Sequence, residues 1–297
     1  MQIYPIVSSS NGNCTLIESG ESSILIDFGM SVRALIECLG IDIYGVEKFN
    51  KELERRVENL DDPEDIKAIN STRASLVKIL NITPLGKEKV ENLDAVLITH
   101  EHADHIRGLK TFGKRFNHIP VFINDMSYQH RENKMDTIQH KNLYAGMELT
   151  IGDFSIKAFT VKHDTKSCFG FVIDDSVIRL GYLTDTGRIT RLIERELEDI
   201  NSLFIESDYD TEKLANFEYY DDILKERIGG DTGHLSNQQA LDLIETIGPE
   251  KLDTIIFGHL SLKTNTPEMV LEGAYERFPD HSDKFMVAPL EERKSLN

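Results

Sequence analysis

The sequence predicts a layered α/β sandwich. Strand candidates fall into two groups along the chain, and helix candidates with apolar residues at helical spacing accompany each group. The sequence has no internal repeat of the kind that a simple βαβ series would show. The 297 residues, 40% hydrophobic and 28% charged, can bury a sizeable core and have the composition of a globular protein. We therefore expect a single domain over residues 1–297, with a helical insertion at residues 43–92.

The first strand group opens the chain as a β-meander. Its strands are expected at residues 3–7, 15–18 and 24–27. The turn-rich segments Ser8–Asn13 and Ser19–Glu21 separate these apolar runs. A helix is expected next at residues 31–39, because Ser31 is a good N-cap and the apolar residues that follow have helical spacing.

The insertion at residues 43–92 is predicted to be mostly helical, at 46–60 and 63–80, with Pro84-Leu85-Gly86 interrupting the pattern. Its nine bases and ten acids give a net charge of −1, whereas the whole chain carries −18. Two interpretations remain open. The insertion is either a solvated helical hairpin or an arm that contacts a partner or nucleic acid.

Strands and helices alternate in the remainder of the chain. Strands are expected at 95–99, 121–123, 148–151, 154–161, 168–173, 177–183, 202–206, 252–257 and 284–288. Helices are expected at 104–116, 126–134, 188–198, 211–228, 236–247 and 266–278.

The densest chemical signal is the segment His100-Glu101-His102-Ala103-Asp104-His105, directly after the apolar run 95–98. Imidazoles and carboxylates are common metal ligands. In extended backbone His100 and His102 point to one side and can bind one ion, while Asp104 and His105 can reach a second ion.

Two metal sites need further ligands, and three candidates follow later strands. These are His163 after 154–161, Asp185 after 177–183 and His259 after 252–257. Each alone could be a hydrogen-bonded turn residue, but together, at three successive strand ends, they favour ligands. If Asp185 bridges, one site is His100, His102, His163 and Asp185, and the other is Asp104, His105, Asp185 and His259.

These motifs resemble the metallo-β-lactamase fold superfamily. Further segments resemble its WalJ/YycJ-like branch, over residues 1–41 and 93–290: Ser8–Cys14, Leu25–Gly29, Ile98–His102, His163-Asp164, Gly233–Asn237 and Gly258–Ser261 with Asn265. The resemblance implies a four-layer αββα sandwich with a dinuclear metal centre, and a DNA exonuclease that acts from 5′ ends in DNA repair or processing. It also implies that Asp27 is a structural residue near the site, although a turn-capping role is equally open.

The mechanism expected from the metals is hydrolysis. A pair of divalent ions about 3.5–4 Å apart can lower the pKa of a water from 15.7 towards about 7 and stabilise the attacking and leaving oxygens of a phosphodiester. Asp104 is assigned a catalytic as well as a ligand role. His234, which lies outside the ligand set, is a candidate for protonating the leaving oxygen, or else a loop residue beside the helix cap Ser236. Asp164 and Glu206 either orient ligands or are solvated turn carboxylates.

The identity of the metal remains open on these residues. Nitrogen-rich ligation suits zinc, while mixed nitrogen and oxygen ligands also accept manganese or iron. Two features depart from the branch. Tyr209, in Glu206-Ser207-Asp208-Tyr209-Asp210, stands where the branch usually has histidine, which puts any role of that imidazole in doubt. The insertion at 43–92 also exceeds the usual short connection.

The net charge of −18 argues against a generally basic surface that coats nucleic acid. DNA nevertheless remains the expected substrate, because bound cations change the local field and bases occur near the predicted site loops, at Arg107, Lys110, Lys114, Arg115, Lys162, Lys166, Arg188 and Lys263. The alternatives are an RNase, a hydrolase of a small phosphodiester, cyclic nucleotide, thioester or lactone, and a metal-bound module without activity.

The cellular address is predicted from three absences. The start of the chain lacks a secretory pattern, no apolar run approaches the roughly 18 residues of a membrane span, and the three cysteines are odd in number and far apart. We expect a cytoplasmic protein without membrane contact, of unknown oligomeric state.

Overall fold

The computed structural model describes residues 1–40 and 84–290, which belong to two compact units. The described residues of the second unit are 31–40 and 84–92. Its described helices, α1 (Val32–Gly40) and α4 (Pro84–Glu91), contact each other. Helix α4 begins at the proline that was expected to interrupt helical structure, because a proline is tolerated in the first turn, where its missing N–H has no partner to lose. The helices expected at 46–60 and 63–80 lie outside the described residues.

The first unit, Met1–Met30 and Leu93–Glu291, contains two sheets. Six strands form the first sheet in the order β1-β2-β3-β4-β5-β6. They are β1 (Gln2–Ser9), β2 (Gly12–Ser19), β3 (Ser22–Ile26), β4 (Ala95–Leu97), β5 (Pro120–Ile123) and β6 (Gln139–Asn142). Strands β1 to β3 are antiparallel, and β3 to β6 run parallel.

Seven strands form the second sheet in the order β13-β12-β11-β10-β9-β8-β7. They are β7 (Glu148–Ile151), β8 (Phe154–Thr160), β9 (Phe169–Asp174), β10 (Arg179–Leu183), β11 (Ser202–Glu206), β12 (Thr254–Gly258) and β13 (Phe285–Val287). This sheet repeats the plan of the first, because the antiparallel strands β7 to β10 are followed by parallel pairing from β10 to β13.

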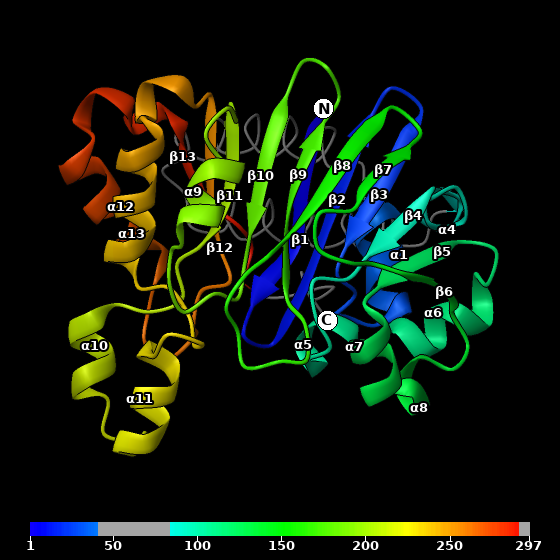
Figure 1. Ribbon diagram of the computed structural model, residues 1–297, viewed down its shortest axis with the longest axis horizontal. Coiled ribbons are helices and arrows are strands. Elements are labelled where there is room, and N and C mark those ends of the chain that lie inside the picture. Colours follow the sequence, from blue (N-terminus) through cyan, green and yellow to red (C-terminus); the bar gives the residue numbers. More distant parts are fainter. Residues whose placement is uncertain (41–83, 291–297) are drawn as a thin grey trace, which may run out of the picture. The chain divides into compact units, whose positions relative to one another are not determined.

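The hydrophobic residues of the second sheet face two separate cores, because successive side chains of a strand point to opposite faces. In β11, Phe204 packs between the two sheets, whereas Leu203 and Ile205 pack in the core that includes residues of the outer helices. Strand β12 alternates likewise, with Ile256 between the sheets. Figure 1 shows the resulting order of helices, sheet, sheet and helices within this unit. The expected αββα sandwich is confirmed.

The helices of the first unit lie outside the two sheets. Beside the first sheet they are α5 (Ala103–Ile106), α6 (Leu109–Arg115), α7 (Asp125–His130) and α8 (Glu132–Met135) (Figure 1). The others are α9 (Arg191–Glu196), α10 (Thr211–Asn216), α11 (Asp222–Gly229), α12 (Asn237–Ile247) and α13 (Pro267–Arg277), with short 3₁₀ turns at Pro249–Lys251 and Pro279–Lys284. None of the helices in residues 1–40 and 84–290 is long and apolar enough to cross a membrane.

Several element predictions were wrong in detail. The ladder of β1 and β2 continues through Ser8 and Asn13, which were expected in a turn, so that only two residues connect the strands. Three expected helices, at 104–116, 126–134 and 211–228, are each divided into two. At 104–116 the division falls at Gly108, because its N–H donates to Phe28 O and a Cβ there would lie 2.1 Å from Met30 O. Strand β6 was not expected at all.

Candidate metal centre

The predicted ligands all follow the carboxyl ends of strands, in loops or, for Asp104 and His105, in the short helix α5. His100, His102, Asp104 and His105 follow β4, His163 follows β8, Asp185 follows β10 and His259 follows β12. Parallel strands end at a common edge of their sheet, and the edges of the two sheets meet here, so that residues far apart in sequence converge. The structure brings all seven predicted ligands together in overlapping groups.

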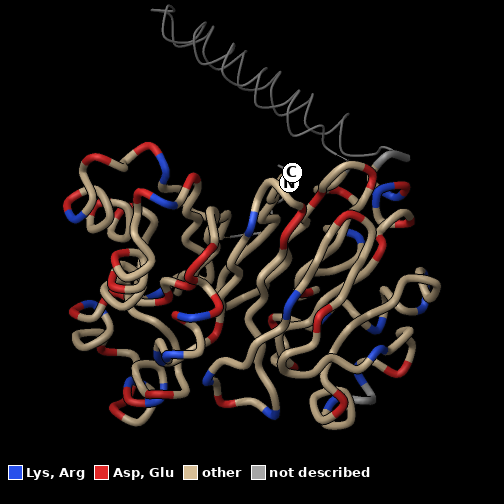
Figure 2. The backbone as a smooth tube through the Cα atoms, turned by 45° about the horizontal axis from the view of Figure 1, so that its top comes forward, with Lys and Arg blue, Asp and Glu red and all other residues tan. Residues whose placement is uncertain are grey.

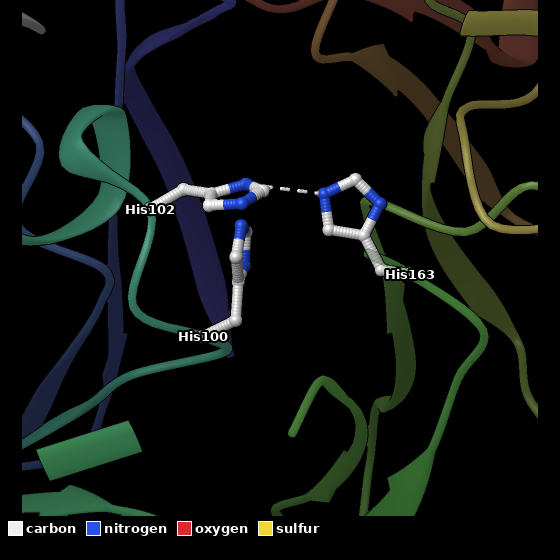
Figure 3. Close-up of side chains that lie close together, drawn as sticks. All are labelled: His100, His102 and His163. Carbon is white, nitrogen blue, oxygen red and sulfur yellow. Dashed lines mark hydrogen bonds between the residues drawn. The ribbon is translucent and has the colours of Figure 1, made fainter. Parts of the chain in front are cut away.

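The first group consists of His100, His102 and His163, which offer three nitrogen atoms within 4.8 Å of one another. In Figure 3 the ring of His163 faces that of His102, and the ring of His100 points towards the ring of His102. The distance from His163 Nε2 to His102 Nδ1 is 3.2 Å. His163 Nδ1 lies 3.0 Å from Gly233 O, to which it can donate, and this leaves Nε2 as an acceptor facing the other two rings.

The second group consists of Asp104, His105 and His259. His105 Nε2 is 3.2 Å from Asp104 Oδ2, and His259 Nε2 is 3.6 Å from the same oxygen. Asp185 lies beside both groups, because its Oδ1 is 3.6 Å from His163 Nε2 and 3.3 Å from His259 Nε2, while its Oδ2 is 3.3 Å from His105 Nε2. This is the position that a bridging carboxylate would occupy.

The backbone adopts unusual angles at three residues of this region. Asp27, Asp185 and His259 have φ of 61°, 55° and 54°, a left-handed conformation that side chains with a Cβ rarely adopt. Asp27 and His259 directly follow β3 and β12, and Asp185 lies two residues after the end of β10. The side chain of each of the three faces a predicted ligand, His105 in the case of Asp27. Backbone strain of this kind often accompanies functional sites.

Asp27 is completely buried and holds His105 in place. Its Oδ2 is 2.8 Å from His105 Nδ1, and its Oδ1 accepts a hydrogen bond from Thr99 N at 2.8 Å. The Thr99 hydroxyl lies within hydrogen-bond distance of the same carboxylate, and also 3.0 Å from His100 Nδ1. With Nδ1 occupied in both rings, Nε2 is the nitrogen that remains for a ligand role.

Glu206, at the end of β11, is completely buried, so its interpretation as a solvated turn residue was wrong. Its Oε1 lies 2.7 Å from His234 Nδ1 and 3.0 Å from His259 Nδ1, and its Oε2 accepts from the backbone N–H groups of Thr186 and Leu235. His234 is thus bound to a carboxylate and is part of the site, although it was equally open as a plain loop residue.

Asp164 is partly exposed and touches the first group from outside. Its Oδ1 is 3.6 Å from His102 Nε2 and 3.5 Å from His163 Nε2. Its Oδ2 accepts from Arg227 Nε at 2.7 Å. Burial would raise the pKa of this carboxyl, but the hydrogen bond from Arg227 holds it below its usual value. The alternative that Asp164 is merely solvated was therefore wrong.

The electrostatics of the centre show an excess of negative charge. Burial disfavours protonation of His105 and His259, but nearby carboxylates, Asp185 foremost, hold the pKa of both rings well above the ordinary value. Despite burial, Glu206 raises the pKa of His234 to about 9. Burial and the adjacent His105 instead hold the pKa of His100 well below its usual value. Without metal, protons on histidine therefore balance the carboxylates, and a divalent cation can take over this role.

Unpartnered polar atoms also fit a metal. His100 Nε2, Asp185 Oδ2 and His259 Nε2 are buried side-chain atoms that make no hydrogen bond. A buried donor or acceptor normally has a partner, and an ion can supply it. Together with the clusters of nitrogen and oxygen atoms, these atoms show that the residues present suit divalent cations.

The centre opens into a cavity of about 230 Å³. Its described lining includes His102, Asp104, His163, Asp185, His234 and His259, and from α11 Leu224, Arg227 and Ile228. None of the eight bases singled out in the sequence belongs to this lining. Tyr209 is buried outside the described lining, and a Cβ on Gly229, at the end of α11, would lie 3.2 Å from its hydroxyl.

Two polar contributors were not expected from the sequence. Asn13 Nδ2 lies 3.1 Å from His105 Nε2 and 3.4 Å from Asp104 Oδ2, so the β1–β2 hairpin reaches the second group. Glu101 accepts from the Ser127 hydroxyl at 2.6 Å and from Lys166 N at 2.9 Å, and so ties the metal motif to the loop that carries His163. Glu101 could have been found from its position between the predicted ligands His100 and His102. The spacing of residues gave no sign that Asn13 contacts Asp104 and His105, which are about ninety residues away in sequence.

Comparison with known proteins agrees with this geometry. Residues 66–255, more than half of the chain, match the model of the beta-lactamase superfamily domain. The chain belongs to this superfamily. It is 34% identical over 200 residues to the exodeoxyribonuclease WalJ of Streptococcus pneumoniae, which covers 65% of this chain and 72% of that protein. It is 28% identical over 183 residues to the exodeoxyribonuclease YycJ of Bacillus anthracis, covering 61% of this chain and 69% of that protein.

The fold has solved counterparts. The metallo-beta-lactamase fold protein YhfI from Bacillus subtilis superimposes with a TM-score of 0.62 at 16% identity, over 96% of this chain and 94% of that one. The expected resemblance to the WalJ/YycJ-like branch is confirmed, and the protein is a metallo-hydrolase of the superfamily.

Proposed function

We propose that this protein is a metal-dependent DNA exonuclease that degrades DNA from 5′ ends. The observation that carries the proposal is the convergence of seven ligand-type side chains, in two adjacent groups with Asp185 beside both. The chain is also similar to two proteins named exodeoxyribonucleases. The 5′-to-3′ polarity and a place in DNA repair or processing rest on the resemblance alone.

Two divalent ions, zinc or manganese with iron as a further option, are the proposed cofactors. His100, His102 and His163 would hold one ion, and Asp104, His105 and His259 the other, with Asp185 between them. Such a pair, when bound, supplies a Lewis acid and a water of lowered pKa for attack on a phosphodiester. Asp27 orients His105, while Asp164 and Glu206 contact the outer sides of the ligand rings.

His234 is the proposed proton donor to the leaving oxygen, and Asp104, which lines the cavity, is the second residue assigned a catalytic role. Glu206 occupies His234 Nδ1, so Nε2 is the ring nitrogen that can deliver a proton. Although burial opposes protonation, Glu206 raises the pKa of His234 to about 9, which keeps the ring charged at neutral pH in the metal-free protein. Protonated histidine is the form that an acid catalyst requires.

DNA is the proposed substrate and the cytoplasm the proposed location. We also propose that residues 1–297 act as one domain and that the insertion at 43–92 contributes a contact to a partner or to nucleic acid.

The test combines metal analysis with a nuclease panel. Purified protein is loaded with zinc or manganese, its metal content is measured by elemental analysis, and it is incubated with 5′-phosphorylated single-stranded and duplex DNA, RNA and a generic phosphodiester ester. Shortening of DNA from the 5′ end is expected. His102→Ala should lose both metal and cleavage, whereas His130→Ala, an exposed histidine outside the centre, should lose neither. Turnover of the small ester or of RNA without DNA cleavage would refute the proposal.

A further inference from the structure

Helix α11 contributes one face to the cavity beside the metal centre. Leu224, Arg227 and Ile228 line the cavity, and their spacing of three and four residues places them on the same side of a helix. Arg227 is the single lysine or arginine in that lining, as far as residues 1–40 and 84–290 define it. No role was assigned to this residue from the sequence.

Arg227 is held next to the first group of ligands by Asp164. Arg227 Nε and Nη2 lie 2.7 Å and 2.6 Å from Asp164 Oδ2. The other oxygen of this carboxylate lies 3.6 Å from His102 Nε2 and 3.5 Å from His163 Nε2. A single carboxylate therefore separates the guanidinium from the predicted ligands. Arginine has five N–H donors, and the pair with Asp164 engages two of its nitrogens, so the Nη1 group remains available to a ligand.

The helix that carries Arg227 is capped at its start and linked to the site at its end. The Asp221 side chain caps its start by accepting from Leu224 N at 2.8 Å. At its end, His234 N donates to Ile228 O at 2.8 Å, which links the helix to the proposed proton donor. Two connections therefore hold Arg227 near the site. The next residue, Ile228, is bonded to His234, and Asp164, which pairs with Arg227, is the next residue after His163.

Charge explains why a cation is needed at this point. Asp104, Asp164 and Asp185 line the cavity, and acidic positions are spread over the described chain (Figure 2). Two metal ions can neutralise the carboxylates and the scissile phosphate, but a nucleic acid strand brings further phosphates with it. Guanidinium matches phosphate geometry with parallel N–H groups and keeps its charge at any working pH.

We propose that Arg227 is a substrate-binding residue that holds a phosphate of the DNA strand next to the scissile one, with Asp164 orienting its guanidinium. This inference rests on the proposed nuclease function. The phosphate is either the 5′-terminal group or the neighbouring internal linkage, since both present the same non-bridging oxygens. The residue thereby contributes to the choice of DNA end.

The experiment compares Arg227→Gln and Arg227→Lys with Arg179→Gln in the metal-loaded protein. Arg179 makes a similar ion pair, at 2.9 Å to Asp174, but stands at the opposite end of β10 from the site. Steady-state cleavage gives KM and kcat on 5′-phosphorylated and 5′-hydroxyl DNA and on DNA with one neutral methylphosphonate linkage. Fluorescence anisotropy gives the Kd for a phosphorothioate oligonucleotide that resists cleavage.

Arg227→Gln is expected to raise KM and Kd about ten- to a hundredfold, the loss of a charge-assisted hydrogen bond to phosphate, with little change in kcat. Arg227→Lys should recover part of the loss, and Arg179→Gln should match the wild type. Removing the contacted phosphate, or its charge, should weaken DNA binding by the wild type but not by Arg227→Gln. The 5′-hydroxyl substrate reveals a terminal contact, and the methylphosphonate substrate an internal one.

Three results overturn the inference. The first is that Kd and KM of Arg227→Gln lie within twofold of those of Arg179→Gln. The second is that Arg227→Gln lowers kcat alone, and the third is that every neutral linkage weakens DNA binding equally in wild type and Arg227→Gln. Failure of the nuclease proposal is distinguishable, because it appears as absent cleavage by the metal-loaded wild type. The anisotropy measurement tests Arg227 in that case as well.

Discussion

Replacing Glu206 by Gln tests the electrostatic account of the centre. The substitution keeps the size of the side chain and an oxygen that can accept from Thr186 N and Leu235 N, but it removes the charge that faces His234 and His259. In the metal-free protein, the pKa of His234 should fall from about 9 towards the ordinary value of histidine, about 6.5.

The size of the effect follows from that difference in pKa. A shift from about 6.5 to about 9 corresponds to about 3.4 kcal/mol at about 1.36 kcal/mol per pKa unit. This figure is a net value, because burial lowers the pKa of His234 while Glu206, Asp208 and Asp185 raise it. We expect the charge of Glu206 to supply about 2 kcal/mol. Since the folded-state pKa is raised, this stabilisation is fully present below about pH 6.5 and is lost as the pH rises through about 9.

The assay is urea unfolding of metal-free wild type and Glu206→Gln at pH 6 and at pH 9.5. The difference in free energy of unfolding between wild type and variant cancels the titrations that the two proteins share. This difference should be about 2 kcal/mol larger at pH 6 than at pH 9.5. NMR titration of the His234 ring gives its pKa directly. A destabilisation of equal size at both pH values, or an unchanged pKa of His234 in the variant, would refute the reasoning.

Three further predictions concern the supports of the centre. Asp27→Asn removes the charge 2.8 Å from His105 Nδ1 and should weaken metal binding about ten- to a hundredfold, measured by competition with a chelator. Gly29→Ala should destabilise the fold by about 3 kcal/mol in chemical denaturation, because the new Cβ would lie 1.5 Å from Asp104 O and 2.6 Å from Asn13 N. Adding zinc to a free concentration of about one hundred times Kd should stabilise the wild type by about 2.7 kcal/mol, measured as a rise in Tm, and His102→Ala by much less.

Each of these predictions has a matched control. Asp94→Asn changes a carboxylate that accepts from Ser23 N at the other end of the first sheet, and should leave metal affinity unchanged. Gly273→Ala, in α13, places its Cβ at an ordinary 3.5 Å from the Leu241 side chain of α12 and should be neutral or stabilising. The argument for Asp27 would be contradicted by equal metal affinity in Asp27→Asn and Asp94→Asn. That for Gly29 would be contradicted by a Gly29→Ala variant as stable as Gly273→Ala. Identical responses to zinc in wild type and His102→Ala would contradict the third argument.

The sequence predicted the buried elements of the fold better than the exposed ones. Strands such as β9 and β11 bury residues on both faces and are mostly apolar, so their bounds were nearly right. Strand β6 consists of Gln-His-Lys-Asn and is largely exposed, so no hydrophobic pattern could reveal it. It pairs with β5 through the backbone, which any sequence can do.

The candidate site was predictable to the extent that its residues come from strand ends. Histidines and carboxylates after apolar runs marked the seven ligands, and the alternation of strands implied that their ends meet. The contribution of Arg227 could not be predicted, because it depends on the break between α10 and α11 within a segment that reads as one helix, and on the resulting direction of α11. The burial of Glu206 likewise depends on the loops that cover the end of β11.

The left-handed backbone at Asp27, Asp185 and His259 has a consequence for protein engineering. Glycine would relieve the conformational cost at each position, roughly 1 kcal/mol or more, so a search for thermostability would rank these three codons among the most attractive to change. Two of them encode proposed ligands and the third supports one. Variants chosen for heat resistance alone would therefore be expected to lose metal binding and activity.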